Sequence, residues 1–223
     1  MEAILQFFET IPSSYRTILL ASGILVFWIL EGAVPLFRFS YRRYRHLGLN
    51  LVFTFTTLVV NLSLAFLTVM AADYVQGQQF GIWFLFTIPL WASVIIAVLV
   101  LDLIGAWFVH IVEHKVKWMW KFHLIHHTDT TVDVTTALRH HPGESVFRAA
   151  FTIAAVVVAG APIAVVFIYQ TASALFSQFN HANINLPRGM DRFLSYLIVT
   201  PHMHKVHHHY VQPLTDNNYG NIF

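Results

Sequence analysis

Apolar residues run in long blocks along this chain, and charged residues gather between the blocks. Four stretches carry at most one charged side chain each, and they cover residues 17–37, 47–72, 74–101 and 149–187. A helix that crosses the hydrocarbon core of a bilayer needs about 20 apolar residues. The first three stretches fit one crossing each, and we place these spans near 17–37, 47–72 and 81–108.

The fourth stretch has 39 residues, which is about twice the length that one span needs. Gly160 and Pro162 interrupt it near its first third, and both residue types break helices. We therefore predict a helical hairpin over residues 148–178. These patterns together predict an all-α integral membrane protein, with about three transmembrane helices and the hairpin forming a single membrane-embedded domain over residues 1–223.

The loops between the blocks predict the sidedness of the protein. The loop 38–46 holds four arginines, whereas the loop 73–80 holds one acid and no base. Because Lys and Arg are enriched in cytoplasmic loops, we expect 38–46 to face the cytoplasm. The hairpin returns the chain to that same side, so residues 109–147 and 179–223 form a cytoplasmic-face cap. This interpretation suits a bacterial inner membrane or the endoplasmic reticulum.

Composition excludes several classes of protein. The chain is 57% hydrophobic and 11% charged, with a mean hydropathy of +0.60, whereas about a quarter of the residues of a soluble domain are charged. Disordered chains need low hydrophobicity and high net charge, so disorder is excluded. With no cysteine, the chain holds no disulfide scaffold, thiolate zinc site or iron–sulfur cluster. A net charge of only +2 does not point to nucleic acid.

Histidine is the most informative residue type here. The chain has fourteen histidines, and all but one of them lie at or after position 110. Residues at positions i, i+3 and i+4 share one face of a helix. Three clusters have this spacing: His110 with His114; His123 with His126 and His127; and His204 with His207 and His208. Their imidazoles therefore form three converging sets, to which His141 and His181 are candidate additions.

Chain geometry limits how these sets can meet. His110 and His127 are 17 residues apart, which is about 25 Å along a straight helix. Those two rings reach one ion only if the chain bends between residues 114 and 123. The alternative is that the clusters serve separate ions.

The number and type of side chains point to a pair of metal ions. Eight packed imidazoles without a metal would leave unpaired polar groups, whose desolvation is costly. Imidazole suits Zn, Cu, Fe and Ni, and eight to ten ligands exceed what one ion takes. Nitrogen ligation at a lipid surface, without thiolate, fits a non-haem di-iron centre that uses O2 to attack an unactivated C–H bond. Zinc can replace iron in recombinant material.

The order of these clusters after apolar spans resembles the fatty acid hydroxylase / sterol desaturase superfamily. The matching pieces run from Asp102 to the end of the chain, and they are the three histidine clusters, Thr136–Arg139, His141-Pro142 with Glu144, Asn180–Ile184, Thr200-Pro201 and Asp216–Gly220. Taken together this pattern is specific, although any single pair of histidines is not.

The resemblance implies an O2-dependent di-iron membrane oxygenase that hydroxylates or desaturates a lipid. Its substrates include fatty acyl, sterol, alkylglycerol and carotenoid-like molecules. A separate donor, such as a cytochrome b5-like or ferredoxin-like protein, supplies electrons. The metal ligands that the resemblance implies are His110, His114, His123, His126, His127, His141, His181, His204, His207 and His208. No catalytic residue beyond these ligands is implied.

Two further expectations concern the surroundings of the centre. We expect the apolar and aromatic residues of 47–108 to line a path by which a lipid tail enters between the spans. The basic residues Arg42, Arg43, Arg45, Lys115 and Lys117 form a candidate docking surface for an acidic donor.

Glu31, within the first span, needs a partner because a charge in the bilayer is expensive.

Two other functions remain open from the sequence. His110-x-x-Glu113-His114 matches an inverted zinc-protease motif, in which Glu113 would be the general base. This hypothesis leaves the other two clusters unexplained, and Glu113 then fits better as a solvated residue or as a partner that orients an imidazole. The second alternative is a histidine-rich metal carrier. The remaining histidines, His46, His140, His202 and His209, are interpreted as packed or interfacial side chains.

Overall fold

The computed structural model describes residues 1–223, and it is built from helices without any strand, which confirms the predicted all-α class. The α-helices are α1 (Glu2–Thr10), α2 (Ser13–Ala33), α3 (Arg43–Gly77), α4 (Leu90–Asp102), α5 (Val109–Lys115), α6 (Lys117–His127), α7 (Pro142–Ala159), α8 (Ile163–His181), α9 (Arg188–Leu194) and α10 (Pro201–His207). Shorter turns are η1 (Ile82–Phe84), η2 (Leu103–Phe108), η3 (Val134–Leu138) and η4 (Leu214–Asp216), of which η2 is a π-helix.

Four segments are long and apolar enough to cross a membrane: Ser13–Ala33, Arg43–Phe84, Leu90–Lys115 and Pro142–Ala159. In the most apolar windows of the first two, only 6% of the residues are buried inside the protein. Their apolar side chains therefore face outwards, as they do on a helix that contacts lipid. A membrane protein is thus supported by length, composition and exposure together.

The third predicted span begins later than the sequence indicates. Residues 81–88 form a loop with one short turn, and α4 starts at Leu90 after Pro89, whose fixed φ suits the start of a helix. From there α4, η2 and α5 run as one helix to Lys115. Val116 leaves the helical region with φ −93° and ψ 107°, and α6 begins at the next residue.

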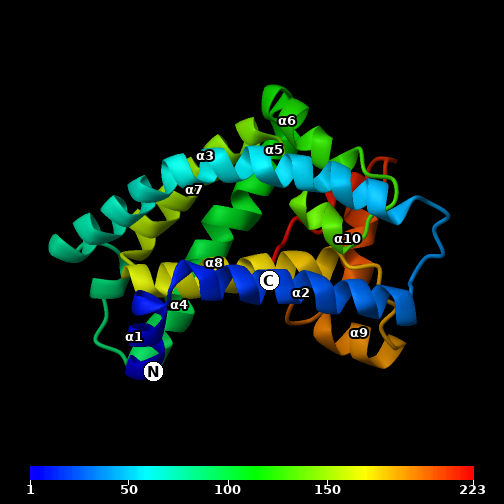
Figure 1. The fold of residues 1–223 in the computed structure, drawn as a ribbon. Coiled ribbons are helices and arrows are strands. Elements are labelled where there is room, and N and C mark those ends of the chain that lie inside the picture. The colour runs from blue at the N-terminus through cyan, green and yellow to red at the C-terminus, as the bar shows by residue number, and fades with distance from the viewer.

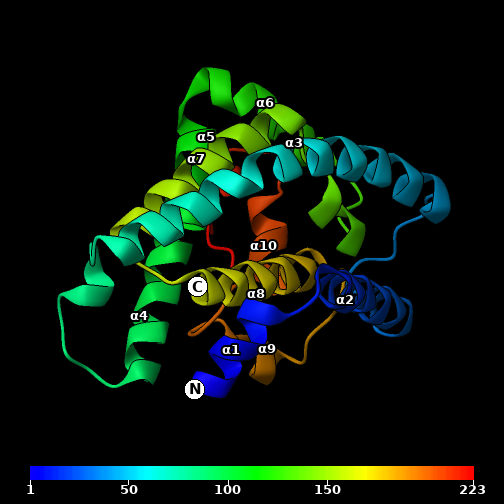
Figure 2. The same cartoon turned by 60° about the vertical axis from the view of Figure 1, so that its left-hand side comes forward.

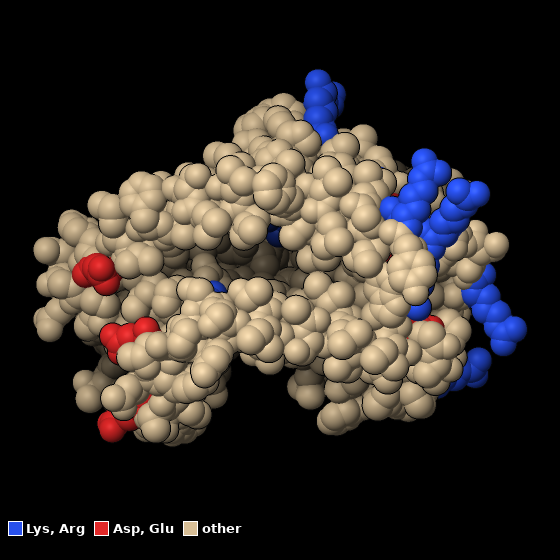
Figure 3. Space-filling view, in the orientation of Figure 1, with Lys and Arg blue, Asp and Glu red and all other residues tan.

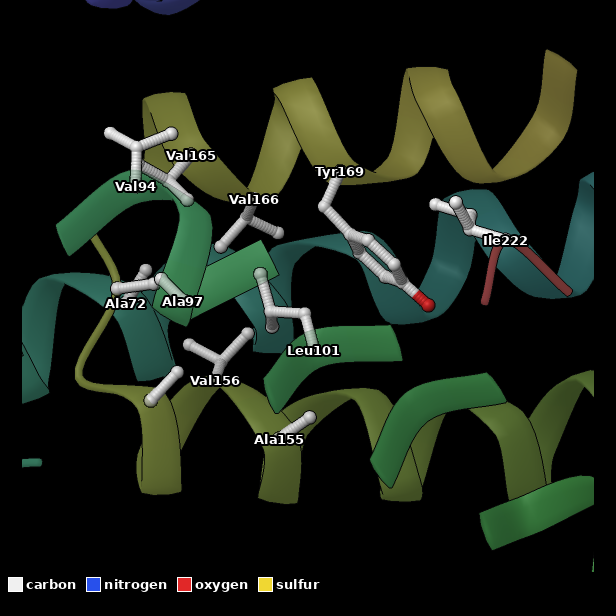
Figure 4. Close-up of a cluster of buried hydrophobic side chains, with 12 residues drawn as sticks. Ala72, Val94, Ala97, Leu101, Ala155, Val156, Val165, Val166, Tyr169 and Ile222 are labelled. Carbon is white, nitrogen blue, oxygen red and sulfur yellow. The ribbon is translucent and has the colours of Figure 1, made fainter. Parts of the chain in front are cut away.

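The predicted hairpin consists of α7 and α8, joined at Gly160, which has φ +65°. A Cβ at Gly160 would lie 2.3 Å from the carbonyl oxygen of Phe80, so only glycine permits this close approach of the α3–α4 loop. The two legs splay apart, because α4 lies between them and packs against both (Figure 4). Its Val94, Ala97 and Leu101 form the apolar core together with α7 and α8 residues.

Glu31, the acid in the first span, has the partners that its position requires. Its carboxylate pairs with Arg43 at 2.8 Å and accepts hydrogen bonds from the backbone N–H groups of Val134 at 2.6 Å and Asn183 at 2.8 Å. Val134 and Asn183 belong to the two segments of the predicted cap. One buried carboxylate of α2 therefore holds both cap segments against the membrane-spanning helices.

Figure 3 shows a hollow in the middle of the molecule. Helices α3 and α7 lie on one side of it and α2 and α8 on the other, while α10 closes one end (Figures 1 and 2). Figure 3 shows exposed Lys and Arg side chains at the end where α3 begins and on α6, and exposed acids at the opposite end, near α1. The histidine-bearing helix ends meet at the basic end of this hollow.

Candidate metal centre

The break at Val116 brings the first two histidine clusters together. It turns α6 back towards α5, so the Nε2 atoms of His110 and His123 lie 3.0 Å apart. His127 follows one helical turn later, with its Nε2 3.2 Å from that of His123. The bend that the sequence left open is therefore present.

The imidazoles sort into two adjoining groups, which we call site A and site B. The nitrogen atoms that face each other within a group all lie within 4.8 Å of one another. Site A consists of His110, His114, His123, His127 and His207, and site B of His126, His181, His204 and His208. The sites touch where the rings of His127 and His208 stack with centroids 4.6 Å apart. Nine of the ten candidate ligands thus lie in one of two groups on one side of the fold.

Each of the two H-x-x-H-H clusters divides its histidines between the two sites. His123 and His127 belong to site A and His126 to site B, while His204 and His208 belong to site B and His207 to site A. Within the shared face, residues i and i+4 are about 40° apart around the helix, whereas the consecutive residues i+3 and i+4 are about 100° apart. The spacing therefore serves a pair of neighbouring sites, with one helix contributing to both.

Most rings are oriented by a hydrogen bond from their outer nitrogen. Backbone carbonyls accept from the Nδ1 atoms of His110 (Tyr219, 2.8 Å), His126 (Arg139, 3.1 Å), His181 (Ser177, 2.7 Å) and His207 (Asn217, 2.7 Å). Carboxylates face the Nδ1 atoms of His123 (Glu144, 3.1 Å) and His114 (Asp216, 3.4 Å). A proton on Nδ1 leaves the lone pair of Nε2 pointing inwards, which is the tautomer that a metal ligand requires.

These inward nitrogens fit a bound cation. In site B the Nε2 of His181 lies 2.9 Å from the Nε2 atoms of both His126 and His204. His126 and His181 both donate from Nδ1 to a carbonyl, so the lone pairs of their Nε2 atoms face each other and repel unless a cation lies between them. At metal–nitrogen distances of about 2.0–2.1 Å, two ligands of one ion lie roughly 3.0–3.4 Å apart. In site A the buried Nε2 atoms of His114 and His207 have no hydrogen-bond partner, as expected of free ligand atoms.

Burial keeps the cluster neutral. Desolvation, reinforced by neighbouring imidazoles, holds the pKa values of His126, His204 and His208 well below the ordinary value of 6.5. A neutral imidazole is the form that binds a metal. The site is therefore preorganised for ligation at neutral pH.

Arg148, Glu113 and Glu144 form a buried cluster of charged side chains that contacts site A through His123. Arg148 donates to Glu113 at 2.6 Å and to Glu144 at 2.8 Å. The same Glu144 oxygen accepts from His123 at 3.1 Å and from His140 at 2.9 Å. Glu113 is fully buried, so it orients the centre through Arg148 and is not the solvated residue that the sequence also allowed. Arg148 was not among the residues predicted from the sequence, although its spacing of four from Glu144 on α7 was a usable signal.

His141 lies outside both sites, in contrast to the other nine candidates. Its Nδ1 accepts a hydrogen bond from the N–H of Gly143 at the start of α7, and its ring packs edge-on against Phe122. This ring therefore caps a helix, and we leave it out of the ligand set.

The interpretation of His46, His140 and His202 as packed side chains fits their contacts, since they pair with Asp129, Glu144 and Asp191.

A cavity of about 290 Å³ adjoins both sites. Of residues 47–108, Gly105 and Ala106 line this cavity, and a lipid path between the spans stays a prediction. Only three of its seventeen lining residues are hydrophobic, and α8 supplies more of the wall than any other helix. The splayed hairpin explains this polar wall, because α4 separates the two legs and leaves their polar faces exposed to the hollow.

Comparison with known proteins gives two matches. The family model described as fatty acid hydroxylase matches residues 94–223, which is more than half of the chain. The ornithine lipid hydroxylase OlsE of Rhizobium tropici is 27% identical over 122 residues. This match covers 55% of the chain but only 36% of that relative, so the chain spans about a third of the relative's length. No solved structure matches.

Proposed function

The chain belongs to the fatty acid hydroxylase family, and from this membership we propose that it is an O2-dependent lipid hydroxylase whose centre holds two iron ions. The observation that carries the proposal is the pair of adjoining groups of buried imidazoles, with their nitrogens turned inwards. Four apolar helices are long enough to cross a membrane, which agrees with an oxidoreductase that acts on membrane lipids.

We assign the five histidines of site A to one ion and the four of site B to the other. Iron takes up to six ligands, so both sites leave positions open for O2 and substrate. Bound iron would supply the activation of O2 for attack on a C–H bond. The chain's own residues fix the tautomers of six of the nine rings through their Nδ1 partners, exclude bulk water by burial and hold the rings close together.

Hydroxylation replaces a C–H bond by C–OH, consumes O2 with two electrons and two protons, and releases water. A separate donor protein, cytochrome b5-like or ferredoxin-like, supplies the electrons. The basic residues at the histidine-bearing end favour docking of an acidic partner there, on the cytoplasmic face that the arginine-rich loop predicts. Of the five candidate residues, Arg43 and Lys115 already pair with Glu31 and Asp216, whereas Arg42, Arg45 and Lys117 are exposed.

The contacts of Glu113 argue against a zinc protease. A general base must reach a metal-bound water, but this carboxylate is fully buried and pairs with Arg148 behind site A. The motif would also use only two of the nine clustered histidines. A loose metal carrier is disfavoured as well, because oriented, buried rings are typical of a resident cofactor.

The test measures metal and product on the same preparation. Full-length protein produced with iron should retain about two iron ions per chain and add one oxygen atom to a membrane lipid, in the presence of O2 and a reductant. His126→Ala and His207→Ala should abolish the product and lower the iron content, while His209→Ala, an exposed neighbour, should do neither. One tightly held zinc with peptide cleavage would favour the protease instead.

A further inference from the structure

The two rings that α10 brings to site B lack the outer hydrogen bonds that orient most of the centre. His126 and His181 donate from Nδ1 to backbone carbonyls, whereas the buried Nδ1 atoms of His204 and His208 have no hydrogen-bond partner. His204 lies on α10, and His208 is the residue that caps its C-terminal end. The positions of these two rings therefore depend on how the backbone of α10 is held against its neighbours.

Lys205 ties α10 to the helix that carries His181. The two helices, α8 and α10, pack against each other (Figure 1). The Nζ of Lys205 donates to the backbone carbonyl oxygens of His181 and, at 3.2 Å, of Ala182. His181 is the last residue of α8, and Ala182 follows it directly. Apart from the ligand rings, Lys205 is the one α10 side chain that hydrogen-bonds to this helix end, since His202 pairs with Asp191 of α9.

The end of a helix suits such a donor. The last carbonyl groups of a helix have no partner within it, and they carry the partial negative charge of its macrodipole. The side chain of Lys205 is half-buried, and its Nζ hydrogen-bonds to the two carbonyls and to no carboxylate. This lysine therefore serves the backbone of α8 rather than an ion pair.

Two other contacts hold the same helix end, but neither of them reaches α10. The carboxylate of Glu31 in α2 accepts from the N–H of Asn183 at 2.8 Å. The side-chain amide of Asn180 donates to the carbonyl of Asn221 in the C-terminal segment at 3.1 Å. These contacts fix α8 against α2 and against the C-terminal segment, so the link to α10 comes from Lys205.

We propose that Lys205 is a positioning residue of site B, whose two hydrogen bonds hold the end of α8 against α10 and thereby keep His181 beside His204 and His208. The Nε2 of His181 lies 2.9 Å from that of His204 and 3.3 Å from that of His208. The inference rests on the proposed function, in which site B holds one ion, and it adds a residue on which that ion depends.

Site A does not depend on this link. Four of its rings come from α5 and α6. The fifth, His207 of α10, has an acceptor of its own in the carbonyl of Asn217 at 2.7 Å. Loss of the Lys205 hydrogen bonds should therefore weaken site B and spare site A.

The first experiment measures Zn²⁺ binding by the full-length protein in competition with a chelator, because zinc accepts imidazole ligands and has no redox chemistry. Lys205→Met keeps the length of the side chain and removes its donor. The affinity for one of the two zinc ions should fall by about tenfold or more, and the affinity for the other should stay at the wild-type value. The matched control Lys121→Met, on the exposed face of α6, should change neither. Wild-type affinity for both ions in Lys205→Met would overturn the inference.

Ligand variants then identify which ion is affected. In a His207→Ala background site B keeps all of its rings, and adding Lys205→Met should weaken the remaining zinc by the same factor. In a His204→Ala background site A is complete, and adding Lys205→Met should change nothing, since groups that do not interact have additive effects. An equal loss in both backgrounds would show that Lys205 supports the fold in general, and it would overturn the inference.

A second variant covers the case in which Lys205→Met does not fold. Lys205→Gln keeps one shorter donor group, so it should lose affinity at site B alone, and an unchanged site B would overturn the inference. None of these measurements needs O2 or a lipid. A missing hydroxylated product would therefore count against the proposed function, whereas a site B that is indifferent to Lys205 would count against this inference and leave that function intact.

Discussion

The Nε2 atoms of His110 and His123 lie 3.0 Å apart although a straight helix would separate the two residues by about 20 Å. The chain meets itself here because Val116 adopts an extended conformation between α5 and α6. One short segment therefore supplies four of the five nitrogens of site A. The fifth, from His207, arrives with α10.

The division into two sites predicts selective loss of metal. Replacing His207 by alanine should lower the iron content from about two ions per chain to about one, because site B keeps all four of its rings. His204→Ala should have the same effect through site B, and the double variant should approach zero. Elemental analysis of purified protein measures this, with exposed His209→Ala as the matched control. Complete metal loss in each single variant would show that the two sites are not separable.

Glu144 is expected to act on metal binding through His123. Glu144→Gln removes the charge that faces the His123 Nδ1 and Arg148 and keeps the size of the side chain. Loss of such an outer partner costs about 10–100-fold in metal affinity. Chelator titration of the iron-loaded protein checks this. Glu9→Gln, on the exposed face of α1, should retain iron like the wild type.

Glu31 should contribute to stability rather than to chemistry. Glu31→Ala leaves the buried N–H groups of Val134 and Asn183 without acceptors, and each unpaired group costs about 1–3 kcal/mol. The midpoint of thermal unfolding in detergent should fall well below that of the wild type, whereas Glu9→Ala should leave it unchanged. An unaltered midpoint in Glu31→Ala would mean that the cap is held in another way.

Acid should destabilise the protein through its buried histidines. Burial holds the pKa values of His126, His204 and His208 well below 6.5 in the folded chain, whereas the unfolded chain takes up protons near 6.5. The unfolded state therefore binds more protons in acid, so stability is present above about pH 6.5 and is lost progressively below it. Each group contributes about 1.4 kcal/mol per pH unit in that range. Unfolding temperatures of metal-free protein should fall from about pH 7.5 to about pH 5.5, and a rise on acidification would contradict this account.

Reversing surface charge should slow electron delivery. Arg42, Arg45 and Lys117 are exposed and free of ion pairs, and electrostatic steering accelerates association by about tenfold or more. Replacing the three by glutamate should reduce the rate of reduction by an acidic donor at low salt, with Arg192→Glu as the control. If the rate is unchanged, the docking surface lies elsewhere.

Periodicity reports local geometry, so it could place side chains on common helix faces. The i, i+3 and i+4 spacings gave eight of the nine histidines that lie in sites A and B, His181 entered as an isolated candidate, and the apolar blocks located the helices. The spacing did not show how the rings divide between sites, because that depends on how α6 and α10 face each other. The hydrogen bond that His141 accepts from the N–H of Gly143 at the start of α7 was not evident from the spacing either.

The sequence did not predict the hydrogen bonds of the outer ring nitrogens or the character of the cavity. The backbone carbonyls of Tyr219 and Asn217 orient His110 and His207, and a backbone acceptor leaves no trace in residue type. The cavity is polar because α4 separates α7 from α8. This separation is a long-range packing effect. Gln170, Ser173 and Ser177 of α8 follow one another at helical spacing in the sequence, but that they line the cavity is known only from the structure.

Anomalous X-ray scattering at the iron edge, from crystals of the iron-loaded full-length protein, tests the central claim most directly. The account predicts two iron peaks in neighbouring positions, one among the rings of site A with His110 and His123, and the other among the rings of site B with His181 and His204. A single peak shared by both groups, or iron bound away from these histidines, would contradict it.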